Sequence, residues 1–287
     1  QASIIGYLCY QLYDVGVLNV LISLPENPFF YLIIIVIYFS LPLSEIFIYR
    51  VKWKFDSWQA FFVFIKKKVV NAEIFGYAGE IYFLNWARKE LKIPVDKAFS
   101  FIKDNNILSS ISSTSVSIIL LVFFSAKGYL NPFKYIPNFD DWYTSLIVVC
   151  GVLVALFVIY KLRYSILAVS LEDGLKISTI YTGRLLITNF LQILQYVIVK
   201  PEVPLAAWFS LVAIQIISTR IPFLPSRDVL YVGLGMEMSG IVQISKTDIA
   251  GLLTANLLVT KILGLFAFGY LSVNDHQSKV SEEKKSN

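Results

Sequence analysis

Ile249–Leu271 reads IAGLLTANLLVTKILGLFAFGYL, an apolar run with a single charged residue, Lys261, near its middle. At ~1.5 Å per helical residue, the run is long enough to cross a hydrocarbon core roughly 30 Å thick. A lysine at that depth costs at least about 2.5–3.5 kcal/mol on insertion scales, so it normally faces a partner or a wet cavity. The stretch therefore predicts a membrane-spanning helix that carries a buried charge.

The composition extends this prediction to the whole chain. Hydrophobic residues make up 56% of the 287 residues and charged residues only 16%, whereas a soluble domain has roughly 25% charged residues. We expect an all-α polytopic membrane protein with about six to seven spanning helices. They would form one domain, residues 1–271, followed by a polar, disordered tail, residues 272–287. The stretches that predict spans are Ser3–Ile22, Phe29–Tyr49, Ile107–Ala126, Tyr143–Tyr160, Leu185–Val199, Leu205–Thr219 and Ile249–Leu271.

Two further stretches are apolar but poorly suited to span. Val69–Trp86 is interrupted by Gly76 and Gly79, and Pro222–Gly240 is interrupted by prolines and glycines. Irregular backbone at membrane depth is tolerated only where protein or water satisfies it, so we expect short, broken re-entrant helices. Each stretch lies between two apolar spans. This order suggests an inverted repeat and is the best sequence indication of a transporter's binding site.

Basic residues are concentrated in three stretches, residues 50–54, 66–68 and 88–103. Short basic loops stay in the cytoplasm, so these stretches are expected to be cytoplasmic loops of a multi-pass cell-membrane protein. Topology alone explains such clusters, and attraction of anionic lipid headgroups is the alternative explanation.

Within Val69–Trp86, acidic and hydroxylated side chains recur at helical spacing. Glu73, Tyr77 and Glu80 would share one face of a continuous helix, with Arg88 at its C-terminal end. The pattern indicates either the wall of a polar groove that accommodates a headgroup or exchanges protons, or an amphipathic helix whose polar face is wet.

Further charges lie in and before the last span. Asp228 follows Arg227 and is well placed to cap a half-helix, whose N-terminus would also attract phosphate. Lys261 is either structural or lines a cavity that binds phosphate. Its candidate structural partners are Glu80, Asp228 and Glu237.

Several of these residues occur in a familiar order: Ile48-Tyr-Arg50, Ala78-Gly79-Glu80, Ala87-Arg88, Asp104, the segment Pro222–Gly240 and Lys261. In this order the chain resembles the flippase-like membrane domain of the lysylphosphatidylglycerol synthase transmembrane family, which includes the N-terminal half of the bacterial multiple peptide resistance factor. Two features depart from the family: the glycines follow Asp228 rather than precede it, and Lys261 replaces the usual arginine. The resemblance implies a bacterial inner-membrane protein that moves a polar lipid between leaflets. It also implies that this chain lacks the cytoplasmic domain that synthesises lysyl-lipid.

These observations lead to three functional hypotheses. The first is a lipid translocator or flippase. In it, Arg88, Arg227 and Lys261 contact phosphate, while Glu80, Asp228 and Glu237 hold those cations or take up protons. The secondary candidates for this path are Arg50, Glu73, Tyr77 and Asp104.

The second hypothesis is a membrane enzyme, or enzyme subunit, that acts on lipid-linked sugars or phospholipid headgroups with paired carboxylates as acid and base. The third is a scaffold that anchors a soluble partner. No catalytic or metal-binding motif is present in the sequence, so we expect no metal and no cofactor, and the translocator is favoured over the enzyme without excluding it. The expected ligands are membrane lipids, anionic phospholipids or lipid-linked headgroups, and not nucleic acid. A homo-oligomer or a separate cytoplasmic enzyme is a further candidate partner.

Overall fold

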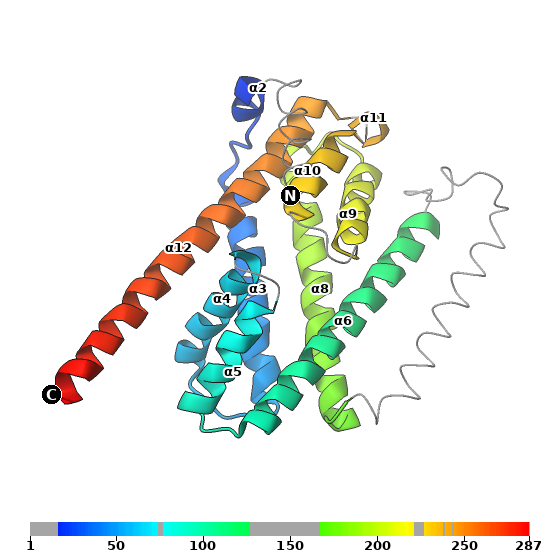
Figure 1. The fold of residues 1–287 in the computed structure, drawn as a ribbon. Helices are drawn as coiled ribbons and strands as arrows, with labels where there is room; N and C mark the ends of the chain where they lie inside the picture. The colour runs from blue at the N-terminus through cyan, green and yellow to red at the C-terminus, as the bar shows by residue number, and fades with distance from the viewer. Residues whose placement is uncertain are drawn as a thin grey trace.

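The structure is a computed structural model that describes residues 17–73, 77–126, 167–220, 227–237, 239–242 and 244–286. Every element in these residues is an α-helix, and long helices run the length of the molecule while short ones gather at its two ends (Figure 1). The helices are α2 Val17–Ile22, α3 Pro28–Arg50, α4 Ser57–Glu73, α5 Ala78–Glu90, α6 Val95–Ala126, α8 Leu171–Val199, α9 Leu205–Arg220, α10 Arg227–Glu237, α11 Ser239–Val242 and α12 Lys246–Ser286.

Three of the described helices are long and apolar enough to cross a membrane: α3, α8 and the first part of α12, Lys246–Gly269. The predicted spans Phe29–Tyr49 and Ile249–Leu271 correspond to α3 and α12, so the prediction of a helical membrane protein is confirmed. α9 is shorter, with 16 residues. Residues 143–160 lie outside the described residues, and the total number of spans stays a prediction.

α8 is longer than the sequence pattern predicts. The sequence predicts a span at Leu185–Val199, but α8 begins at Leu171 and has 29 residues. The helix starts early because the Ser170 hydroxyl accepts a hydrogen bond from the Asp173 backbone N–H at 3.2 Å, which satisfies a free N–H group of the first turn. Arg184 therefore lies inside a helix that is long and apolar enough to cross a membrane.

The broken segment Val69–Trp86 takes part in a helical hairpin. α4 ends at Glu73, Tyr77 adopts the left-handed conformation with φ 73°, and α5 then packs back against α4. Gly79 permits this close approach, since a Cβ atom there would overlap the backbone oxygen of Lys67. The chain thus turns back on itself between α4 and α5, and the re-entrant character of the segment stays a prediction. The continuous polar stripe predicted on it is wrong, because Glu73 and Glu80 belong to different helices.

The predicted cytoplasmic loop at residues 66–68 is also wrong, since these lysines lie within α4. Successive helical residues point about 100° apart, so the three side chains diverge. Lys66 lies 4.9 Å from the centre of the Tyr82 ring and Lys68 3.5 Å from that of Tyr38, whereas Lys67 points into the core. Residues 88–90 and 95–103 are likewise helical, in α5 and α6, and the membrane side on which all three basic stretches lie stays a prediction.

The second broken segment, Pro222–Gly240, contributes the short helices α10 and α11 rather than a span. α10 packs on α12, where Gly235 lies against Leu253 and Ile249. In Figure 1 the α4–α5 hairpin lies toward one end of the α3–α8 pair, and α9, α10 and α11 lie at the other end. An inverted repeat would require such an arrangement, although the repeat itself stays a prediction.

Two main hydrophobic cores hold these ends together. One core is aromatic, with the Tyr49, Phe64 and Phe83 rings 4.6–5.3 Å apart, and it joins α3, α4, α5, α6 and α8. The other surrounds Trp208 and Leu211 of α9 and joins them to α2, α3, α8, α10 and α12. The long helices α3 and α8 belong to both cores and so fix the two ends relative to each other.

The tail, residues 272–287, differs from the prediction of disorder. α12 continues as a helix to Ser286. Neither proline nor glycine interrupts residues 272–286, and the run Glu282-Glu-Lys-Lys consists of good helix formers. Propensity along this stretch therefore favours continuation of the helix.

Candidate functional site

A cluster of buried charges lies where α3, α4 and α5 meet. The ammonium of Lys67 on α4 forms a hydrogen-bonded ion pair with Glu45 on α3, and both residues are less than 5% exposed. Glu80 on α5 approaches the same ammonium at 3.8 Å. Buried charges are tolerated only when they are paired and hydrogen-bonded, so one lysine holds two carboxylates inside this end of the bundle.

Aromatic rings enclose the ammonium. The rings of Tyr49 and Phe83 each lie with their centres 5.4 Å from Lys67 Nζ, and the negative ring faces attract a cation. The Tyr49 hydroxyl accepts a hydrogen bond from Asn105 Nδ2 at 3.2 Å, and the Tyr181 hydroxyl donates to Asn105 Oδ1 at 3.1 Å. Asn105 of α6 therefore ties α3 to α8 beside the charged cluster.

Arg184 lies one helical turn beyond Tyr181 on α8. Unlike Lys67, it is not in a hydrogen-bonded ion pair with Glu45. Its guanidinium carbon lies 5.8 Å from the centre of the Tyr181 ring and feels the charge of Glu45. Its Nε is buried and has no hydrogen-bond partner within the described part of the chain. A guanidinium whose Nε has no partner among the described residues, on a helix long and apolar enough to cross a membrane, is suited to bind an anion.

Two of the predicted site residues lie inside this part of the molecule, Glu80 half-buried and Asp104 fully buried. Glu80 belongs to the cluster, and its Oε2 has no hydrogen-bond partner among the described residues. Asp104 is fully buried but has a structural contact: it accepts hydrogen bonds from the backbone N–H groups of Ala168 and Val169 at 2.7 and 2.9 Å. It thereby ties α6 to the segment that leads into α8.

The remaining predicted residues lie elsewhere. Arg50 sits at the end of α3 and Arg88 near the end of α5, both exposed. Exposed positions on the surface are also occupied by Tyr77, Glu237 and Lys261. Glu73 is the last residue of α4, and Arg227 and Asp228 are the first two of α10; their side chains lie outside the described part of the structure. The structure thus brings Glu80 into a buried cluster and leaves the roles of the others as predictions.

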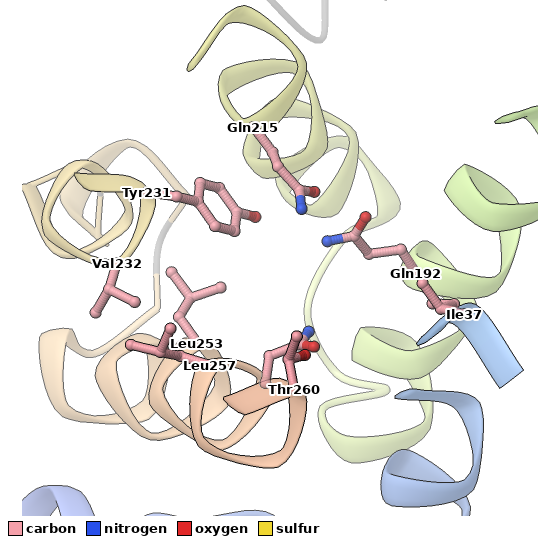
Figure 2. Close-up of a pocket in the computed structure, with 9 residues that line it drawn as sticks. Ile37, Gln192, Gln215, Tyr231, Val232, Leu253, Leu257 and Thr260 are labelled. Carbon is pink, nitrogen blue, oxygen red and sulfur yellow. The ribbon is translucent and has the colours of Figure 1, made fainter. Parts of the chain in front are cut away.

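A polar cavity of about 150 Å³ lies nearer the other end of the bundle (Figure 2). Five helices contribute to its wall, and the side chains of Gln192, Gln215, Tyr231 and Thr260 face it. The lining residues are Ile37 from α3, Gln192 from α8, Gln215 from α9, Tyr231 and Val232 from α10, and Leu253, Asn256, Leu257 and Thr260 from α12.

The Tyr196 hydroxyl organises the polar side of this cavity. It accepts a hydrogen bond from Gln192 Nε2 at 3.1 Å and lies 3.4 Å from the Tyr231 hydroxyl. Asn256 also interacts with it. Because Tyr196 itself is fully buried, it holds these three side chains in place from behind the cavity wall.

Sequence reasoning missed Glu45, Lys67 and Arg184. Glu45 could have been found, since it is the only charged residue in the predicted span Phe29–Tyr49 and intramembrane charges are usually functional. Lys67 is one of three consecutive lysines that the sequence does not distinguish, and Arg184 directly precedes the predicted span Leu185–Val199. The polar residues of the cavity carried no signal, because each is a single amide or hydroxyl in an apolar helix.

The fold and its buried charges define a helical membrane protein with a polar interior. No family model, curated protein or solved structure matches the chain. The resemblance to the flippase-like family therefore stays a prediction.

Proposed function

We propose that this membrane protein is a lipid translocator, which moves the polar headgroup of a phospholipid through the helical bundle while the acyl chains stay in the membrane. The observation that carries the proposal is Arg184. A buried guanidinium donor without a partner on a spanning helix is costly, and a phosphate group would satisfy it with charge-assisted hydrogen bonds.

The neighbouring cluster supports this role for Arg184. Glu45 pairs with Lys67 rather than with Arg184 at hydrogen-bond distance, so the Arg184 Nε, which has no partner among the described residues, is left for a ligand. Glu80 adds a second carboxylate, 3.8 Å from the Lys67 ammonium. In this proposal the two carboxylates keep Lys67 fixed and the phosphate passes at Arg184. Arg88, Arg227 and Lys261 are proposed contacts of the headgroup along its path.

The test is lipid movement in proteoliposomes, followed with a fluorescent phospholipid whose label is quenched chemically from outside. We expect Arg184→Gln to slow movement by about tenfold to a hundredfold, which corresponds to the loss of a hydrogen bond to a charged group. Arg184→Lys should be intermediate, because lysine keeps the charge without the planar fork. Lys176→Gln is the matched control, since Lys176 is an exposed residue of the same helix, paired with Glu172.

The stability of the Arg184→Gln variant distinguishes the proposed role of Arg184 from a structural one. Because its Nε forms no hydrogen bond to the described residues, Arg184→Gln should leave the thermal unfolding temperature unchanged or raise it. A fall in stability together with unchanged lipid movement would show that Arg184 is structural and would remove the basis of the proposal.

A further inference from the structure

We infer that the cavity shown in Figure 2 is a second binding site, which takes an uncharged, hydroxyl-rich group: the glycerol or sugar of a lipid headgroup. Its assignment to a lipid rests on the proposed function. Its preference for neutral hydroxyls rests on the cavity itself.

The polar groups of the cavity wall are uncharged and match a polyol. Its five polar residues are three amides, from Gln192, Gln215 and Asn256, and two hydroxyls, from Tyr231 and Thr260. Each of these groups both donates and accepts hydrogen bonds, as the hydroxyls of a polyol do. None of the described residues that line the cavity is charged, so neither a phosphate nor an ammonium would find a counterion here.

Part of this hydrogen-bonding capacity is not used by the described residues. Gln192, Tyr231 and Asn256 interact with the buried Tyr196 hydroxyl, which orients them. The side chains of Gln215 and Thr260, by contrast, form no hydrogen bond with any other described residue. In Figure 2 the Gln215 amide points across the opening toward that of Gln192, so a ligand between them would meet groups from two helices.

Size and shape agree with a small polyol. A cavity of about 150 Å³ has room for about five water molecules at roughly 30 Å³ each, which is comparable to a glycerol group or one small sugar ring. Its apolar wall, Ile37, Val232, Leu253 and Leu257, would contact the C–H groups of such a ligand, as in most small-molecule sites.

The position of the cavity relates it to Arg184. Ile37 and Gln192 line the cavity on α3 and α8, and Glu45 and Arg184 lie on the same two helices. Each pair is separated by about two helical turns, roughly 12 Å. Because α3 and α8 run antiparallel (Figure 1), the charged region and the neutral cavity are neighbouring levels of one helix pair. A headgroup that moves along this pair would exchange a charged site for a neutral one.

The test measures binding to the purified protein in detergent by calorimetry, with three short-chain probes. These are dihexanoyl phosphatidylglycerol, a dihexanoylglycerol glucoside and dihexanoyl phosphatidylethanolamine. The first two carry neutral hydroxyls and the third an ammonium. We expect at least one of the two hydroxylated probes to bind more tightly than the ethanolamine lipid. Of these two probes, the one that binds more tightly shows whether the cavity takes a glycerol or a sugar.

Variants locate the binding. Thr260→Val and Gln215→Leu should each lower the affinity for the hydroxylated probe about threefold to tenfold, the effect of one neutral hydrogen bond. The affinity for the ethanolamine lipid should stay unchanged. Thr188→Val is the matched control, because Thr188 is half-buried on α8, outside the cavity, and hydrogen-bonds only its own helix at Leu185. Thr260→Val is nearly isosteric, so it remains informative if Gln215→Leu does not fold.

The outcomes separate this inference from the proposed function. Equal binding of all three probes, or cavity variants that bind like the wild type, would overturn the inference even if lipids move in proteoliposomes. Selective binding that the cavity variants weaken would support it, even if no lipid moves and the translocator proposal fails.

Discussion

Lys67 and Glu45 are the residues on which the interior charge balance depends. Each is buried, and each compensates the other through a hydrogen-bonded ion pair. An ion pair in an apolar interior adds little net stability over a well-packed apolar pair, but the loss of one partner leaves an uncompensated buried charge. The two residues are therefore expected to be strongly coupled.

Lys67→Met should destabilise the protein by about 3–5 kcal/mol, because Glu45 would remain buried without its partner. The double variant Lys67→Met, Glu45→Gln should recover much of this loss. Lys66→Met is the control, since its ammonium lies over the Tyr82 ring at the surface side of α4. The measurement is thermal or denaturant unfolding in detergent. If the double variant lost as much stability as Lys67→Met and Glu45→Gln lose together, the coupling would be contradicted.

Residue types along the sequence do not reveal every buried charge. Lys261 was identified as an isolated charge in an apolar run, and the same reasoning applied to the run before Arg50 would have identified Glu45. Lys67 could not be distinguished from Lys66 and Lys68, because burial of one residue in three depends on which face of α4 meets α3. That choice is made by packing rather than by residue type.

At the scale of elements, Gly79 determines how closely α5 packs on α4. Its N–H donates to Asn71 Oδ1 at 2.7 Å, and a Cβ atom at this position would overlap the backbone of α4 at Lys67. The hairpin and the burial of Lys67 therefore depend on the same contact.

Gly79→Ala should destabilise the protein by about 1–3 kcal/mol, the usual cost of overpacking a close contact. Gly183→Ala is the matched control on α8, because a Cβ there meets no atom within 4 Å. Alanine in that helix interior should be neutral or stabilise the protein by roughly 0.5–1 kcal/mol. Equal unfolding temperatures for the two variants would show that α4 and α5 do not approach this closely.

The elements themselves were partly predictable. Apolar length predicted α3 and α12, and glycine breaks predicted that residues 69–86 and 222–240 would not span. The early start of α8 at its Ser170 cap was missed, because the polar first turns of a long helix resemble a loop in composition. The turn at Tyr77 was also missed, since a non-glycine residue rarely adopts the left-handed conformation.

For the whole molecule, the antiparallel pair α3 and α8 predicts the sidedness of the loops. With Cys9 and Cys150 replaced by serine, a cysteine at Asp56 should react from one face of the membrane. Cysteines at Glu26 and Glu202 should react from the opposite face, because they lie at the other ends of α3 and α8. The basic cluster at residues 50–54 predicts that the Asp56 face is cytoplasmic. Labelling of all three positions by an impermeant reagent from one side of intact cells would contradict the spanning arrangement.

The sequence by itself determined that this is a helical membrane protein and where several of its helices lie, because apolar length and helical geometry act locally along the chain. It also identified Glu80 as a residue of interest. Only the tertiary structure decided that Glu80 shares Lys67 with Glu45, that the buried Nε of Arg184 has no partner among the described residues, and that Gln192, Gln215 and Asn256 line one cavity. These residues come from different helices, and their meeting depends on how whole helices pack.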